Sequence, residues 1–357
     1  MVVTFLNPKN RFQAFLCILI SIFIVILGVF SVTSRVSQCI DIQGDTTLMA
    51  ACLMMNSGSF SSDNSSNESG KKVVKKPLDN NKTTTKTEKA VDTTVPKDEA
   101  TYPITEVDLS SSKLYDNVSL RNTTSYTVDV KERLSRTLPF EISDTRQAQV
   151  LIVHTHTCES YMDSDSGFYY ESFYPRTTDN EKNVYAVGEA IAKSLKEENI
   201  GVVHAKTQHD YPSYDGAYSR SYDTIMSYLE KYEGIKVVLD IHRDSMTTDS
   251  NARLKPTFYY NGKKGAQIMI MAGHDSSYTN FPTWEDNLTF ALKLQNTCES
   301  MYQGMTRPLS FGDFTYNMNA NSGSLLIEVG TDANTLDEAV FSGELLGNAL
   351  AKVLQKS

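Results

Sequence analysis

Three segments between residues 149 and 205 decide the fold: QVLIV (149–153), VYAVGEAIAKSLKEE (184–198) and GVVHA (201–205). The first and third are short apolar runs, a pattern typical of strands that are buried on both faces of a sheet. The middle segment places apolar residues at helical spacing between charged ones, which predicts an amphipathic helix. A strand, a helix and a second strand in this order predict a βαβ unit, in which the two strands run parallel.

The same alternation continues toward the C-terminus. Strands are predicted over residues 235–241, 266–272 and 325–329, and helices over residues 218–232, 284–305 and 336–354. Alternating strands and helices predict an α/β domain with a mixed, mostly parallel sheet and helices on both of its faces. Ligands of such sheets bind beyond the carboxyl ends of the strands, so functional residues are expected at that edge.

The N-terminal part is organised differently. Residues 12–32 (FQAFLCILISIFIVILGVFSV) form an apolar run of about the 20 residues that a transmembrane helix needs. No small-residue cleavage site follows the run, which predicts a retained anchor. Lys9 and Arg11 precede it, which predicts a cytoplasmic segment over residues 1–11 and an extracytoplasmic location for the rest of the chain.

Composition predicts the remaining boundaries. Residues 33–100 are expected to be a disordered, flexible linker, because the part from 57 onward has almost no large apolar side chains. Residues 101–146 are expected to be an N-terminal extension of the α/β domain, which fills residues 147–357. The chain has 34 Lys and Arg residues against 43 Asp and Glu residues, a formal net charge of −9. This balance argues against nucleic acid as a partner.

Polar residues follow three of the predicted strands. QVLIV leads into HTHTCESY (154–161), KVVL leads into DIHRD (240–244), and the last strand carries Glu328. Because the carboxyl ends of parallel strands meet at one edge of a sheet, these residues are expected to converge.

The residue types in this group are those of a hydrolytic zinc site. Two imidazoles and one carboxylate around an open position are the usual ligands of such a site, and His156, Glu159 and His242 fit that set. Glu328 is then a free carboxylate that can carry a proton from the attacking water to the leaving nitrogen, which makes it the candidate catalytic residue.

Several neighbouring residues have alternative roles. His154 is an alternative to His156 as a ligand, because residues two apart on a strand point to the same side; otherwise it contacts the substrate or supports a ligand. Asp240 either accepts a hydrogen bond from a ligand histidine or caps the strand. Arg243 and Asp244 either contact the substrate or pair with each other.

Four segments carry a family resemblance: LIVHTHTCESY (151–161), QHDYPSYDGAYSRS (208–221), KVVLDIHRDS (236–245) and SLLIEVG (324–330). In this order they closely resemble the stage II sporulation protein P family, septal peptidoglycan hydrolases of endospore-forming bacteria. The resemblance covers residues 120–355 and extends to an N-terminal anchor and a variable linker.

The resemblance implies a zinc-dependent N-acetylmuramoyl-L-alanine amidase with additional endopeptidase activity on stem-peptide cross-links. It implies a role in septal wall thinning and engulfment during sporulation, with peptidoglycan as substrate. It also implies a single-pass protein of the cell membrane, at the sporulation septum and the engulfing membrane. The implied partners are the stage II sporulation proteins D and M.

Carried over by position, the family's HTHT-x-ES-Y segment falls on 154–161, its D-x-HRD segment on 240–244 and its LLEVG-like segment on 326–330. The implied fold is similar to that of zinc cell-wall amidases, in which the metal carboxylate comes from the first long helix. Glu181 and Glu189, which flank or lie on that helix here, are therefore alternatives to Glu159 as the third ligand.

Two other functions fit the same residues. An H-x-x-E pair with a distant histidine also suits a metallocarboxypeptidase-like enzyme that trims stem peptides. A domain of this kind without catalytic activity would instead be a module that binds the wall or a partner protein.

Overall fold

The computed structural model describes residues 99–142 and 147–355, which belong to one compact unit of the chain. The predicted anchor at 12–32 and nearly all of the predicted linker at 33–100 lie outside the described residues. Within the described residues, no helix combines the length and the apolar character that a membrane crossing requires.

The main sheet has seven strands. Their order is β2 (Leu120–Asn122), β10 (Leu309–Gly312), β9 (Ile268–Gly273), β11 (Ser324–Thr331), β6 (Val237–Asp244), β3 (Val150–Val153) and β5 (Val202–His204). The β9–β11 pairing is antiparallel and the other five pairings are parallel, which confirms the predicted mixed, mostly parallel sheet.

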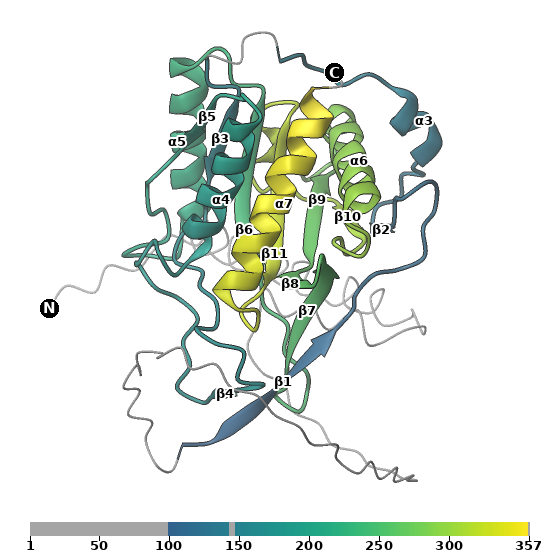
Figure 1. Ribbon diagram of the computed structural model, residues 1–357. Helices are drawn as coiled ribbons and strands as arrows, with labels where there is room; N and C mark the ends of the chain where they lie inside the picture. The colour runs from purple at the N-terminus through teal and green to yellow at the C-terminus, as the bar shows by residue number, and fades with distance from the viewer. Residues whose placement is uncertain (1–98, 143–146, 356–357) are drawn as a thin grey trace, which may run out of the picture. The chain divides into compact units, whose positions relative to one another are not determined.

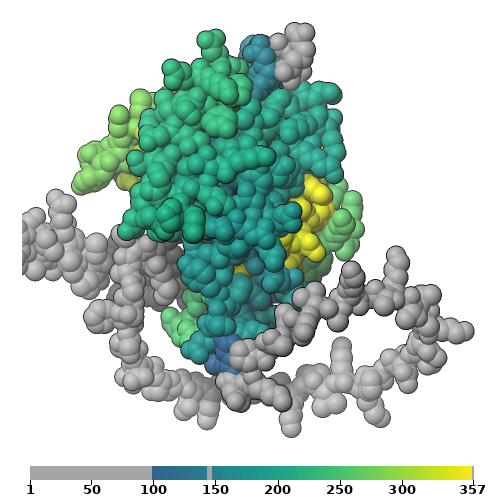
Figure 2. All heavy atoms as spheres, turned by 90° about the vertical axis from the view of Figure 1, so that its left-hand side faces the viewer, coloured from purple at the N-terminus to yellow at the C-terminus, as the bar shows by residue number. Residues whose placement is uncertain are grey.

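Helices cover both faces of this sheet. The helices α4 (Val184–Glu197), α7 (Leu336–Leu354) and α6 (Trp284–Met301) lie side by side on one face, as Figure 1 shows. The helix α5 (Ala217–Lys231) packs against β3 on the other face. In Figure 2 the teal and green atoms of the part around α5 face the viewer, and yellow α7 is visible at the edge.

The two faces follow from the alternation of side chains along each strand. In β3, Val150 and Ile152 belong to the large core beneath α4, α6 and α7, whereas Leu151 and Val153 join Ile225 of α5 in a smaller core. A strand that is apolar on every residue is therefore buried on both faces, as the QVLIV run predicts.

A second, four-stranded sheet was not predicted from the sequence. It has the order β4 (Phe168–Tyr170), β1 (Thr101–Val107), β7 (Arg253–Tyr260) and β8 (Lys263–Ala266). Its strands are polar or short and lack the apolar runs that identify the main sheet. The Asn261-Gly262 pair turns the β7–β8 hairpin with φ of 50° and 76°, as two-residue hairpin turns require.

Two further elements in the N-terminal extension contact the α/β domain. The strand β2 pairs with β10 at the edge of the main sheet, and α3 (Val130–Ser135) packs against α6. The 3₁₀ helix η1 (Met318–Ala320) lies beside α5 and β11.

Most predicted boundaries differ from the observed ones by a few residues, and the two largest extensions or losses have local reasons. The strand β6 continues to Asp244 instead of ending at Ile241, because β11 pairs with it as far as Thr331. The helix α6 ends at Met301 instead of Met305, because the chain turns through Gly304, whose φ is 83°.

The helices α4 and α7 approach each other closely at two glycines of α7. A Cβ atom on Gly347 would lie 2.7 Å from Ser194 Cβ and 2.9 Å from the Ile191 carbonyl oxygen, and one on Gly343 would lie 3.0 Å from Val187. Only a residue without a side chain fits at Gly347 while both backbones keep their positions.

We expect Gly347→Ala to destabilise the protein by about 1–2 kcal/mol, because the clash with α4 outweighs the gain in helix propensity. Urea unfolding of the full-length protein measures this. Glu344→Ala on the same helix is the control and is expected to stay within about 0.5 kcal/mol. A Gly347→Ala protein as stable as wild type would show that α4 and α7 are not in close contact.

Candidate metal and catalytic site

The paired strands β6 and β11 place the central residues of the site. Successive side chains alternate between the faces, so Asp240, His242 and Asp244 share the face of β6 that does not point toward α4 and α7. Glu328 of β11 stands directly opposite His242 in the parallel ladder. The sequence prediction that these two strand ends converge is therefore confirmed.

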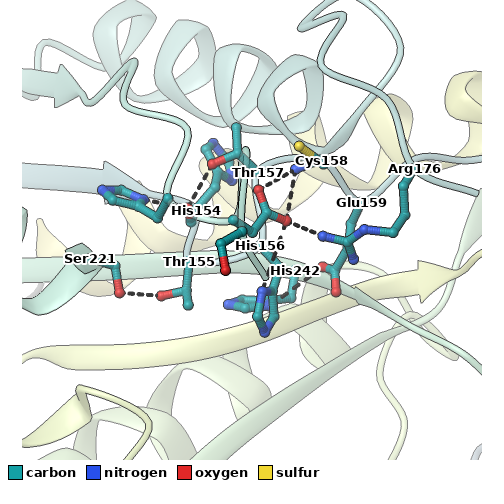
Figure 3. A network of polar contacts seen from close by, with 12 residues as sticks. His154, Thr155, His156, Thr157, Cys158, Glu159, Arg176, Ser221 and His242 are labelled. Carbon is teal, nitrogen blue, oxygen red and sulfur yellow. Dashed lines mark hydrogen bonds and ion pairs between the residues drawn. The ribbon is translucent and has the colours of Figure 1, made fainter. Parts of the chain in front are cut away.

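The segment after β3 brings His156 and Glu159 to the same place. The backbone turns there, with the Glu159 N–H donating to the His156 carbonyl at 3.0 Å. The Glu159 Oε2 atom lies 3.4 Å from His242 Nδ1, and the His156 and His242 rings are perpendicular with centroids 5.4 Å apart. Figure 3 shows these three side chains grouped where the segment meets β6.

A second carboxylate stands on the other side of the His242 ring. The Asp240 Oδ1 atom lies 3.0 Å from His242 Nε2 and accepts the Thr155 backbone N–H at 2.8 Å. Burial lowers the pKa of His242, but Asp240 and Glu159 outweigh this and hold it well above its usual range. Burial raises the pKa of Glu159, but His242, Arg243 and His156 outweigh it and lower the value to about 2.

Glu328 is buried without a partner for one of its oxygens. The side chain is 6% exposed, and Oε2 has no hydrogen-bond partner. Burial, followed by the nearby charge of Asp244, raises the pKa of Glu328 to about 8, against the opposing effect of His242. A carboxyl group that titrates near neutral pH is suited to accepting and releasing protons.

Three residues that were not predicted surround His156. The Tyr214 ring stacks on the imidazole, with ring centroids 4.4 Å apart and an interplanar angle of 7°. The Arg176 guanidinium lies 5.0 Å from the centroid of the Tyr214 ring. Asp210 is buried, forms an ion pair with Arg176, and has Oδ2 3.9 Å from His156 Nδ1. The tyrosine-rich segment QHDYPSYDGAYSR (208–220) is the sequence signal that could have located Asp210 and Tyr214.

The alternative ligands lie in other surroundings. The two ring nitrogens of His154 lie 2.9 Å from the Ile241 carbonyl oxygen and 2.8 Å from His204 Nε2. Glu189 lies 2.7 Å from the other nitrogen of His204, and Glu181 is exposed on the segment that leads into α4. The structure therefore groups His154 with Glu189 through His204, and groups His156 with Glu159 and His242.

Arg243 and Asp244 have separate partners. The Arg243 guanidinium is buried and donates to the carbonyl oxygens of Ser160 at 3.1 Å and Pro175 at 2.8 Å. It thereby fixes the segment that carries Glu159. The Asp244 carboxylate pairs with Arg307 at 2.9 Å. The two side chains do not pair with each other as charged groups.

The donor atoms match a zinc site in part. Within residues 99–142 and 147–355, no three His, Cys, Asp or Glu side chains are arranged to hold a metal ion as they stand. Ligand atoms that lie about 2.0–2.1 Å from a tetrahedral zinc ion are about 3.3–3.4 Å apart, and His242 Nδ1 and Glu159 Oε2 have this separation of 3.4 Å. His156 Nδ1 is buried without a hydrogen-bond partner. The residues therefore fit the ion if His156 moves toward the other two.

Comparison with solved structures finds distant likenesses to amidases. N-acetylmuramoyl-L-alanine amidase AmiC2 of Nostoc punctiforme is 12% identical with a TM-score of 0.35, covering 60% of this chain and 97% of its own. The CwlD amidase from Clostridioides difficile, solved in complex with the GerS lipoprotein, is 12% identical with a TM-score of 0.37, covering 59% and 97%. Scores this low assign neither a fold nor an activity. A comparison with curated proteins gives no significant match.

Comparison with protein-family models gives a match over most of the chain. The model described as stage II sporulation protein P (SpoIIP) matches residues 40–351, which include all four segments that carry the resemblance. The chain therefore belongs to the stage II sporulation protein P family.

Proposed function

We propose that this protein is a zinc-dependent peptidoglycan hydrolase that cleaves the amide bond between N-acetylmuramic acid and L-alanine. The observation that carries the proposal is His242, held between the carboxylates of Asp240 and Glu159, with Glu328 opposite it in the ladder. Family membership supports this activity, an additional endopeptidase activity on stem-peptide cross-links, and a role in septal wall thinning and engulfment during sporulation.

In this proposal His156, Glu159 and His242 hold the metal ion. A bound zinc ion would supply Lewis acidity that polarises the amide carbonyl and makes water a better nucleophile at neutral pH. The Asp240 carboxylate lies 3.0 Å from His242 Nε2 and attracts that side of the ring, which leaves Nδ1 facing Glu159. Tyr214, stacked on His156, restricts the orientation of that ring.

Glu328 carries the proton. As a carboxylate it takes one proton from the attacking water while the new C–O bond forms, and it then gives that proton to the leaving nitrogen as the C–N bond breaks. The products are a glycan with a free lactyl carboxylate and a stem peptide with a free amine. The low exposure of Glu328 keeps competing water away from this proton.

The setting of the reaction is also a proposal. The predicted anchor at 12–32 would place the domain outside the cytoplasm, at the sporulation septum, where the stage II sporulation proteins D and M are the proposed partners. Two alternatives make different products. A carboxypeptidase-like enzyme releases single amino acids from stem peptides, and a binding module releases nothing.

We expect the full-length protein to release free stem peptide from purified sacculi and to contain about one zinc ion per chain. His156→Ala and His242→Ala should lose both metal and activity, because each removes a ligand. Glu328→Gln should keep the metal and lose activity by at least about 100-fold, because only the proton carrier is removed. Product analysis by mass spectrometry and metal analysis on each variant measure this.

His154→Ala is the matched control, since His154 is a buried histidine of the same segment that contacts other groups. It should keep its zinc. Wild-type protein that binds no zinc and leaves sacculi intact, even with the partner D protein present, would contradict the hydrolase proposal and favour the binding module.

The raised pKa of Glu328 also predicts a pH-dependent stability of the metal-free protein. The folded-state pKa of about 8 lies above the ordinary value of 4.5, so the stabilisation by neutral Glu328 is complete below pH 4.5 and is lost as pH rises through 8. Glu328→Gln should therefore unfold at the same temperature as wild type near pH 4.5, and several degrees higher above pH 8.

Thermal unfolding in the presence of a chelator, at a series of pH values, measures this difference. The control is Glu181→Gln, because Glu181 is exposed. An equal difference between Glu328→Gln and wild type at every pH would show that Glu328 does not titrate in this range.

A further inference from the structure

Arg307 lies on the same face of the sheet as the proposed catalytic residues. It precedes β10, and its backbone N–H donates to the Ile268 carbonyl at 2.8 Å. Its guanidinium reaches Asp244, with Nη1 2.9 Å from Oδ2. Asp244 follows His242 by two residues on β6, so Arg307 is next to the face that carries His242 and Glu328.

One edge of this guanidinium has no partner. Arg307 is 4% exposed, and Nη1 contacts Asp244 and the sulfur of Met246, whereas Nε and Nη2 are buried without any hydrogen-bond partner. A buried donor without an acceptor is energetically costly, and the cost is greater when the group is charged. We therefore expect a ligand, rather than a group of the chain itself, to accept hydrogen bonds from Nε and Nη2 of Arg307.

The shape of the free edge specifies the chemistry of that group. The Nε–H and Nη2–H bonds of arginine are nearly parallel, and together they bind the two oxygens of a planar carboxylate. The acidic side chains in the neighbourhood do not fill this place. Asp244 occupies Nη1, Asp332 pairs with Arg253 at 2.9 Å, and Glu328 keeps Oε2 without a partner.

The connection between β6 and β7 lies beside the guanidinium. Ser245 and Thr247 are exposed there, and Met246 between them is half-buried with its sulfur 3.4 Å from Arg307 Nη1. A ligand would reach the guanidinium by displacing this side chain, which is unbranched and can change its conformation readily.

We propose that Arg307 is a carboxylate-binding subsite that recognises the free α-carboxylate of the acidic second residue in the stem peptide. This inference rests on the proposed amidase function, because it assigns the substrate group next to the bond that is cleaved. The second residue follows L-alanine, so its carboxylate is a short distance from the scissile amide. A substrate with a carboxamide at that position cannot form the paired charge-assisted bonds.

The test uses two N-acetylmuramoyl tripeptides, L-Ala-γ-D-Glu-L-Lys and its counterpart with the α-carboxylate converted to a carboxamide. We expect full-length wild-type protein with zinc to prefer the carboxylate form by about 10- to 100-fold in kcat/KM. Arg307→Lys keeps a cation beside Asp244 but lacks the paired edge, so it should lose this preference. Its rate on the carboxamide form should fall less than its rate on the carboxylate form.

Arg133→Lys is the matched control, because Arg133 is equally buried, pairs with Glu285, and belongs to α3, outside the site. It should keep the preference. Equal rates of wild type on both substrates, or an Arg307→Lys loss that is the same for both, would overturn the subsite and give Arg307 a structural role. The comparison of the two tripeptides with wild-type protein tests the subsite even if Arg307→Lys does not fold.

Binding separates this proposal from the proposed hydrolysis. Calorimetry of both tripeptides with chelator-treated wild-type protein requires no turnover. If neither tripeptide is hydrolysed but wild type binds the carboxylate form more tightly, and Arg307→Lys does not, the subsite stands and the amidase proposal fails. If both are bound equally, the subsite is wrong whatever the activity.

Discussion

The pairing of β6 with β11 is the constraint on which the rest of the site depends. It is a parallel ladder at the centre of the sheet, and it sets His242 directly opposite Glu328. Because neighbouring strands are about 4.8 Å apart, the backbones fix these two side chains within reach of one shared ligand. The β-bulge after Glu328, at Gly330 with a φ of 65°, then ends the regular register and directs the chain toward α7.

This ladder concentrates negative charge in a buried place. Asp240, Glu159, Glu328 and Asp244 all lie near His242, and each has little contact with water. Burying charges is costly unless opposite charges offset them. Arg307 offsets Asp244, and His242 and Arg243 partly offset Glu159. A divalent cation among these donors would supply the missing positive charge, which is the electrostatic reason for proposing one.

The sequence predicted five of the seven strands of the main sheet and its polar edge, because these are marked by strong local patterns, whereas the short strands β2 and β10 were missed. In QVLIV the four residues after Gln149 are all apolar, and DIHRD directly follows an apolar run, so each strand and its functional end can be located without long-range information. The same patterns were uninformative for the second sheet. Strand β1 is TYPITEV and β8 is KKGA, and partners distant in sequence rather than local residues decide their pairing.

The site residues that were not predicted from the sequence were missed for a similar reason. The alternation of side chains along a strand predicted that His154 and His156 point to the same side. However, β3 ends at Val153, so this alternation does not apply to the turn that carries both histidines. Asp210 and Tyr214 are distant in sequence from His156, and Arg307 is distant from Asp244, so only the fold brings them together. Their roles depend on tertiary contacts that a single sequence does not encode locally.

The identity of the metal ligands is the claim that most needs direct observation. A crystal structure of the zinc-loaded protein, with anomalous differences measured on both sides of the zinc absorption edge, locates the ion and its ligands in one experiment. We predict one zinc peak bonded to His156, Glu159 and His242, with Glu328 close by but not coordinating. A peak bonded to Glu181, Glu189 or His154, or no peak at saturating zinc, would contradict it.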